Sequence, residues 1–195
     1  MRTASVKRET KETQISIELN LDLPGEQLIE TGQGFFDHLL SQLAFHGRLS
    51  LKVQAKGDQQ IDDHHLIEDT GITLGMALRQ ALGERQGLVR YHSLQLPMDE
   101  VLVGCALDLT TRPYLVYGLT PAQQWLGQFD TALAREFWVA LVNATGCNLH
   151  LQQLANGNAH HLLEGSFKAF AVCLQRASRP DPTLAGGASS TKGLL

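Results

Sequence analysis

A six-residue pattern that occurs twice constrains the fold of this chain more than any other feature. The first copy, DHHLIE, spans residues 63–68, and the second, AHHLLE, spans residues 159–164, at an offset of 96 positions. After each copy, apolar residues recur at the spacing of one helix face, as far as Leu82 in the first and Ala177 in the second. Repetition at a constant offset indicates duplication. The sequence therefore predicts two related halves, 1–90 and 91–180, each with a helix that begins at its motif.

Segments with alternating apolar and polar residues precede these helices. The strand-like segments are 13–19, 49–55, 101–109 and 147–154, and two shorter helical patterns cover 35–45 and 133–142. The economical interpretation is an α+β fold with two duplicated halves, each a small mixed β-sheet backed by helices. Residues 181–195 form a C-terminal tail too rich in Gly, Ser and Pro for a core, although its segment 190–193 (STKG) has the composition of an anion-binding string.

Composition bounds the class of protein. The 195 residues, 43% of them hydrophobic and 18% charged, can bury one core or two small cores that share an interface. Sixteen basic and twenty acidic residues give a net charge of −4, which argues against general binding to nucleic acid or to an anionic membrane. Cys105, Cys147 and Cys173 fit no disulfide or zinc-knuckle spacing, and neither a signal peptide nor a membrane-spanning run is evident. We therefore expect a cytoplasmic protein.

The duplicated motif has the residue types and the spacing of a metal chelate. On a helix, positions i and i+4 share a face, so the first histidine of each motif can act together with the glutamate that ends it. The second histidine points roughly 100° away, because a helix has about 3.6 residues per turn. One motif can thus serve two ions, which suggests two mixed sites with ligands from both halves or from different subunits. The residues concerned are His64, His65, Glu68, His160, His161 and Glu164.

The ligand types narrow the choice of ion. Imidazole and carboxylate without a nearby thiolate favour Mn²⁺, Fe²⁺ or Zn²⁺, and zinc is less natural if six ligands are present. The spacing differs from the His-Glu-x-x-His of zinc proteases. A single His-His pair could equally start a solvated helix, but its repetition favours the metal interpretation. A fifth histidine, His38, lies in the 35–45 segment, and its positional counterpart in the second half is Glu136.

Several segments together resemble the imidazoleglycerol-phosphate dehydratase family, in its monofunctional form, across nearly the whole chain. Besides the two motifs and the residues that follow them, they are 31–40 (TGQGFFDHLL), 90–91 (RY), 97–100 (PMDE), 107–113 (LDLTTRP) and 190–193 (STKG). Many family members have histidine where this chain has Glu136, and we expect the carboxylate to substitute as an oxygen ligand. His150 is the nearest rival, although its strand-like segment favours a structural role. The resemblance implies two Mn²⁺ ions per active site, held by His38, His64, His65, Glu68, Glu136, His160, His161 and Glu164.

The resemblance also implies the remaining site residues and the assembly. Glu12 matches the family glutamate that reaches the substrate, and it is the leading candidate for acid–base catalysis. The carboxylates Glu68 and Glu164 are further catalytic candidates. The alternative interpretation of Glu12 is a solvated charge at a strand edge. The family forms a hollow homo-oligomer of twenty-four subunits with active sites between them. A phosphate pocket maps onto Gln42, His46, Arg90, Arg112, Lys168, Ser190 and Lys192.

The implied reaction is a hydro-lyase step of histidine biosynthesis, the dehydration of imidazoleglycerol phosphate to imidazole acetol phosphate. In this reaction the substrate's imidazole would lose a proton, bridge the ions as imidazolate and form a diazafulvene-like intermediate stabilised by the metal charge. Two other classes are compatible with the motif alone. One is a di-metal phosphoester hydrolase, which normally uses several aspartate ligands, and the other is a non-catalytic metal-binding assembly.

Overall fold

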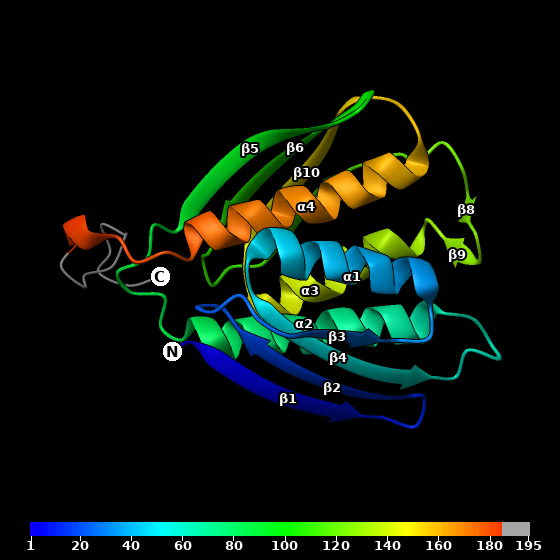
Figure 1. Ribbon diagram of the computed structural model, residues 1–195, viewed down its shortest axis with the longest axis horizontal. Helices are drawn as coiled ribbons and strands as arrows, with labels where there is room; N and C mark the ends of the chain where they lie inside the picture. Colours follow the sequence, from blue (N-terminus) through cyan, green and yellow to red (C-terminus); the bar gives the residue numbers. More distant parts are fainter. Residues whose placement is uncertain (185–195) are drawn as a thin grey trace.

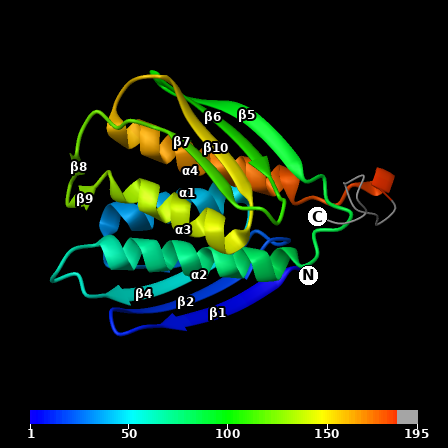
Figure 2. The same cartoon turned by 180° about the vertical axis from the view of Figure 1, so that it is seen from behind.

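Two four-stranded β-sheets enclose a layer of four helices in this protein (Figures 1 and 2). The structure is a computed structural model, and it describes residues 1–184. The predicted α+β fold with two repeated halves is confirmed. Within the described residues, no helix is both long enough and apolar enough to cross a membrane.

The first half contains four strands and two helices. In chain order these are β1 (Thr3–Glu9), β2 (Thr13–Asn20), β3 (Gln27–Glu30), α1 (Gly34–Gly47), β4 (Ser50–Gly57) and α2 (His64–Leu82). The sheet order is β1-β2-β4-β3; β1 and β4 run antiparallel to β2, and β3 runs parallel to β4. Side chains alternate along β2, where Ile15, Ile17 and Leu19 are buried against the helices.

The second half repeats this plan. Its elements are β5 (Tyr91–Met98), β6 (Val101–Asp108), β7 (Tyr114–Gly118), α3 (Leu133–Thr145), β10 (Asn148–Ala155) and α4 (Ala159–Ala177). The sheet order β5-β6-β10-β7 has the same strand directions as the first sheet. A short hairpin of β8 (Trp125–Leu126) and β9 (Phe129–Asp130) is inserted before α3, and a 3-10 helix (Pro182–Leu184) follows α4.

Helices of different halves pack against each other. α2 covers β1 and β2 of its own sheet and α4 covers β5 and β6, but α1 packs on α4 and α3 packs on α2. Aromatic rings join these helices at the centre of the molecule. The ring centroid of Phe137 on α3 lies 5.1 Å from that of Phe167 on α4 and 5.4 Å from that of Phe36 on α1. The two halves therefore share one hydrophobic core.

All four helices begin at the end of the molecule that lies opposite the N-terminus (Figure 1). α2 begins at His64 and α4 at Ala159, as the positions of the two motifs predicted. The first turns of the helices consequently bring the histidines and carboxylates of both halves to one end of the fold.

Candidate metal-binding site

Three of the predicted ligands meet where the beginning of α1 faces the beginning of α4. The Nε2 atoms of His38 and His160 lie 2.8 and 2.9 Å from the same carboxylate oxygen, Oε2 of Glu164. The two imidazole centroids are 5.4 Å apart, and the ring of Phe35 packs edge-on against His160 at 5.0 Å. Two imidazoles and a carboxylate whose ligand atoms converge form a donor set that suits a divalent ion such as manganese, iron or zinc.

Glu164 is a stable anion in this cluster. Burial of this side chain would raise the pKa of its carboxyl group, but hydrogen bonds from Lys168, His38 and His160 outweigh burial and lower the pKa to about 2. The Lys168 Nζ atom lies 2.5 Å from the second carboxylate oxygen, Oε1. The cluster therefore presents a negatively charged oxygen between two imidazole nitrogens at neutral pH.

The corresponding residues of the first motif are more open. The Nε2 atom of His64 lies 3.9 Å from Oε2 of Glu68, and their side chains are 39% and 45% exposed. Because α3 packs on α2 as α1 packs on α4, Glu136 on α3 takes the position that His38 has on α1. The Glu136 carboxylate accepts a hydrogen bond of 3.2 Å from Arg135, and among residues 1–184 its oxygens are not grouped with His64 and Glu68.

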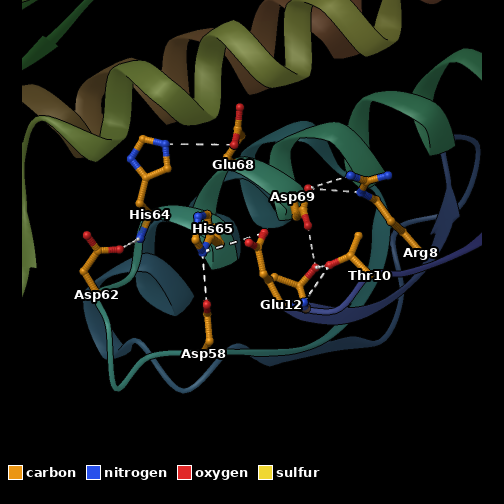
Figure 3. A network of polar contacts seen from close by, with 10 residues as sticks. Arg8, Thr10, Glu12, Asp58, Asp62, His64, His65, Glu68 and Asp69 are labelled. Atoms are coloured by element: carbon orange, nitrogen blue, oxygen red, sulfur yellow. Dashed lines mark hydrogen bonds and ion pairs between the residues drawn. The ribbon is translucent and has the colours of Figure 1, made fainter.

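The second histidine of each motif is held by a carboxylate from a loop. The Nδ1 atom of His65 lies 3.1 Å from both oxygens of Asp58 (Figure 3), and Nδ1 of His161 lies 3.1 Å from Oε2 of Glu100. Because an ionised carboxylate only accepts hydrogen bonds, each Nδ1–H donates and the Nε2 lone pair is left for another ligand. The hydrogen bond with Asp58 raises the pKa of His65. Hydrogen bonds from backbone N–H groups, first that of Asn158, and from His161 lower the pKa of Glu100 to about 2.

Sequence reasoning did not single out Asp58 or Glu100. Each lies with other carboxylates in a connection between elements, Asp58 with Asp62 and Asp63 and Glu100 with Asp99, so no periodic pattern marks it. Glu100 lies within the PMDE segment that resembles the family, and it directly precedes β6 as Glu12 directly precedes β2. This correspondence between the two halves is the signal that could have found it.

Glu12 lies in the turn between β1 and β2, beside α2 (Figure 3). Its Oε2 atom is 3.9 Å from Nδ1 of His65, which is too long for a hydrogen bond, and its side chain is 54% exposed. Glu12, Asp58 and His65 form one group of converging potential ligand atoms, and Asp99, Glu100 and His161 form another. The turn before the second strand thus brings a carboxylate near the second histidine in both halves.

The described residues predicted to bind phosphate come from the helices α1 and α4, from the segment before β5 and from the connection between β6 and β7. Gln42 and His46 lie on α1, and Lys168 lies on α4; burial and then the charge of Lys168 lower the pKa of His46. Arg90 directly precedes β5, and its backbone N–H donates to the carbonyl of Ala177 at the end of α4. Lys168 precedes Ala177 by nine residues, or roughly 13 Å along the axis at about 1.5 Å per residue.

Arg90 is already engaged within the chain. Its Nε and Nη2 atoms donate to the two oxygens of Asp108 at 2.7 and 3.1 Å, which raises the pKa of the guanidinium. Arg112 is exposed in the connection between β6 and β7, and Ser190 and Lys192 lie outside the described residues. His150 lies on β10 and belongs to none of the three ligand groups found among residues 1–184.

The fold and these clusters define an α+β protein that repeats one sheet-and-helix unit and that gathers histidine–carboxylate groups suited to divalent metal ions. The family model for imidazoleglycerol-phosphate dehydratase matches residues 31–174. The chain therefore belongs to the imidazoleglycerol-phosphate dehydratase family, and its activity is that of a hydro-lyase of histidine biosynthesis.

Named relatives and solved structures agree with this membership. The imidazoleglycerol-phosphate dehydratase of Paracoccus denitrificans (strain Pd 1222) is 52% identical over 195 residues and is covered completely, as is this chain. That of Trichodesmium erythraeum is 51% identical over the whole chain and is covered over 92% of its length. The crystal structure of the Staphylococcus aureus enzyme matches with a TM-score of 0.82 and 35% identity, covering 90% of this chain and 97% of that one. The crystal structure of IGPD from Pyrococcus furiosus in complex with (S)-C348 matches with a TM-score of 0.85 and 33% identity, and the match covers 97% of this chain and 100% of that one.

Proposed function

We propose that this protein dehydrates imidazoleglycerol phosphate to imidazole acetol phosphate with two manganese ions in each active site. The observation that carries the proposal is the convergence of His38, from the first half, with His160 and Glu164, from the second, in a chain of this family. The repeat supports a second ligand set of the same design, in which Glu136 on α3 joins His64 and Glu68 on α2.

The donor atoms fit a divalent ion of intermediate hardness. Imidazole nitrogens and a carboxylate oxygen converge in the cluster of His38, His160 and Glu164, and none of the three groups found among residues 1–184 contains a thiolate that would favour a softer ion. When bound there, such ions would supply Lewis-acid stabilisation of negative charge on the substrate. Glu164, with a pKa of about 2, is suited to be an anionic ligand, because it stays ionised at the pH at which the enzyme works.

The positions of the second histidines support active sites between subunits. His65 and His161 donate through Nδ1 to Asp58 and Glu100, so that each Nε2 is available to a ligand outside its own cluster. Each convergent cluster offers three protein donors, which leaves coordination positions for a histidine of another subunit. We therefore propose a homo-oligomer, with the twenty-four subunits that the family resemblance implies.

The phosphate group of the substrate is proposed to bind between two basic sets. Gln42, His46 and Lys168 would contribute from one chain, and Arg90, Arg112, Ser190 and Lys192 would contribute from a neighbouring chain, because Arg90 is bound to the end of α4 at Ala177, roughly 13 Å along the helix axis from Lys168. Arg90 is oriented for such contacts by its two hydrogen bonds to Asp108. Binding of a remote phosphate helps to orient the reacting carbons over the metal ligands.

Glu12 is proposed to move the proton between carbon and oxygen. Its carboxylate is exposed and close to His65, whereas its counterpart Glu100 is fixed by a 2.6 Å hydrogen bond from the Asn158 backbone and by His161. Glu68 and Glu164 assist as ligands. We also propose the cytoplasm as the compartment of the reaction, since the three cysteines of the chain are free thiols.

The test is an assay of manganese-loaded protein with imidazoleglycerol phosphate. Imidazole acetol phosphate without released phosphate is the expected product. Released phosphate would identify a hydrolase instead, and no turnover at full metal content would identify a non-catalytic assembly. In the same assay, Glu12→Gln should lower kcat by about 100-fold or more without loss of metal. Near-normal turnover of this variant would remove Glu12 from the acid–base role.

A further inference from the structure

We propose that Asp69 is a positioning residue, which holds the turn that carries Glu12 against α2 through a buried hydrogen-bond chain. The inference rests on the acid–base role proposed for Glu12. Asp69 is 6% exposed and follows the candidate ligand Glu68 by one residue, but it points toward the β1–β2 hairpin and not toward the metal-ligand groups (Figure 3). A buried carboxylate in a hydrophobic core is costly unless its partners compensate, so its retention calls for a reason.

Both oxygens of Asp69 are bound to the hairpin. The Arg8 side chain on β1 donates to Oδ1 through Nε at 3.0 Å and through Nη2 at 2.9 Å. The Thr13 hydroxyl, at the beginning of β2, donates to Oδ2. One carboxylate on the helix thus connects the last part of β1 with the first part of β2, on either side of the turn.

The hydrogen bonds continue from Thr13 to the backbone of Glu12 in a single direction. Because the Asp69 carboxylate only accepts, the Thr13 hydroxyl must donate to it, and Thr13 Oγ1 can then accept from the Thr10 hydroxyl, 3.1 Å away. Thr10 Oγ1 in turn accepts from the backbone N–H of Glu12 at 3.1 Å and from that of Thr13 at 2.9 Å. The peptide of Glu12 is therefore tied to the helix through two hydroxyl groups (Figure 3).

The second half shows that the fold does not require this hydrogen-bond chain. At the positions equivalent to Arg8, Thr13 and Asp69, the second half has Leu96, Val101 and Gly165. Gly165 faces apolar side chains: a Cβ added to it would lie 3.9 Å from Cδ2 of Leu96 and 3.3 Å from Cγ2 of Val103. Glu100, the counterpart of Glu12, is held instead by Asn158 and His161.

The hydrogen-bond chain from Asp69 also fixes where the backbone of Glu12 lies relative to His65. His65 and Asp69 are four residues apart and share a face of α2, so one helix face presents both the imidazole and the anchor of the turn. Asp58 takes the hydrogen bond of His65 Nδ1, and so Glu12 does not have to orient this histidine. The first half can therefore hold Glu12 by its backbone and leave its carboxylate available.

The deciding variant is Thr13→Val, because it removes the central hydroxyl at nearly constant volume. In the manganese-loaded assembly we expect kcat to fall about 10- to 100-fold, as for a misplaced catalytic group, with KM within about twofold and full metal content. Thr13→Ser, which keeps the hydroxyl, should restore most of kcat. The matched control is Thr145→Val, since the buried Thr145 hydroxyl has no hydrogen-bond partner among residues 1–184.

Hydrogen exchange followed by mass spectrometry supplies a readout that does not depend on activity. In Thr13→Val and in Asp69→Asn, the backbone amides of residues 10–13 should exchange at least about tenfold faster, while exchange in α3 and α4 is unchanged. Unchanged exchange of this segment, or a lower melting temperature with normal kcat, would overturn the proposal even if Glu12→Gln is inactive. If Glu12→Gln keeps its activity, the acid–base assignment fails, and the exchange of residues 10–13 alone decides whether Asp69 holds the turn.

Discussion

Glu136 is the predicted ligand at which this chain differs from the histidine of many family members. Its place on α3 repeats that of His38 on α1. Because imidazole and carboxylate both suit manganese, Glu136→His should keep metal content and kcat within about threefold, whereas Glu136→Ala should lower metal affinity about tenfold or more. Metal analysis after dialysis, together with kcat, measures both. Arg135→Ala, which removes only the neighbouring hydrogen bond, is the control, and full metal retention by Glu136→Ala would show that Glu136 is not a ligand.

Cys147 should make the stability of the fold depend on pH in a way that does not involve the metal-ligand groups. Burial raises the pKa of its thiol from about 9 to about 12. As the pH rises, the thiol of the unfolded chain ionises before the thiol of the folded protein. The free energy of unfolding is therefore unaffected by this thiol below pH 9, and it falls as the pH rises from 9 toward 12, by at most about 1.4 kcal/mol per pH unit. Urea unfolding at pH 8 and at pH 10 should show a smaller loss of stability for Cys147→Ala than for the wild type. Equal losses would contradict the shifted pKa.

At the scale of residues, the sequence reveals the groups whose type and spacing repeat. The two His-His-x-x-Glu motifs stand out because four of eight histidines occupy them at a constant offset. Asp58, Glu100 and Asp69 could not be predicted in this way, because single carboxylates are common and their significance depends on which loop lies beside which helix. Which loop lies beside which helix follows from the pairing of β1 with β2 and of β5 with β6, and this pairing is seen only in the folded structure.

The contact between α2 and α3 requires glycine where the two backbones meet. A Cβ on Gly75 would lie 2.6 Å from the Cβ of Ala144 and 2.7 Å from the carbonyl oxygen of Leu141. Gly75→Ala should therefore lower the free energy of unfolding by about 1–3 kcal/mol through overpacking. Gly34→Ala, where nothing lies within 4 Å of the added Cβ, should change it by less than about 1 kcal/mol. Urea unfolding measures both, and an equal effect of the two substitutions would argue against close packing of α2 on α3.

At the scale of elements, the strands and helices with a strong apolar period were predicted. Buried residues alternate in the central strands β2, β4, β6 and β10, and apolar residues recur at helical spacing in α1 to α4. The outer strands β1, β3, β5 and β7 were not identified. They lie at sheet edges, where more side chains meet solvent, and β5 includes Pro97, which sheets accept mainly at an edge. The pairing of α1 with α4 and of α2 with α3 depends on how the halves dock, which no local pattern encodes.

At the scale of the whole molecule, the exchange of helix partners explains why duplication produced shared sites. If each half packed its own two helices together, His38 would face the first motif and Glu136 the second. Because α1 packs on α4, the cluster of His38, His160 and Glu164 combines both halves, and because α3 packs on α2, the proposed set with Glu136 would do the same. The position of His38 beside His160 and Glu164 is thus a consequence of the common core, and the halves depend on each other for their chemistry as well as for burial.

Removal of metal should act on the assembly as well as on the activity. His65 and His161 donate through Nδ1 and keep the Nε2 lone pair for another ligand, so that in the proposed oligomer each ion joins two subunits, and ion binding stabilises the contact by mass action. Dialysis against a chelator should therefore abolish turnover and lower the average mass measured by light scattering, and added Mn²⁺ should restore both. His65→Ala should show the smaller mass even with manganese, whereas His150→Ala, outside the clusters, should assemble normally. Chelated protein of unchanged mass would mean that the subunits associate through other contacts and that the ions serve the reaction alone.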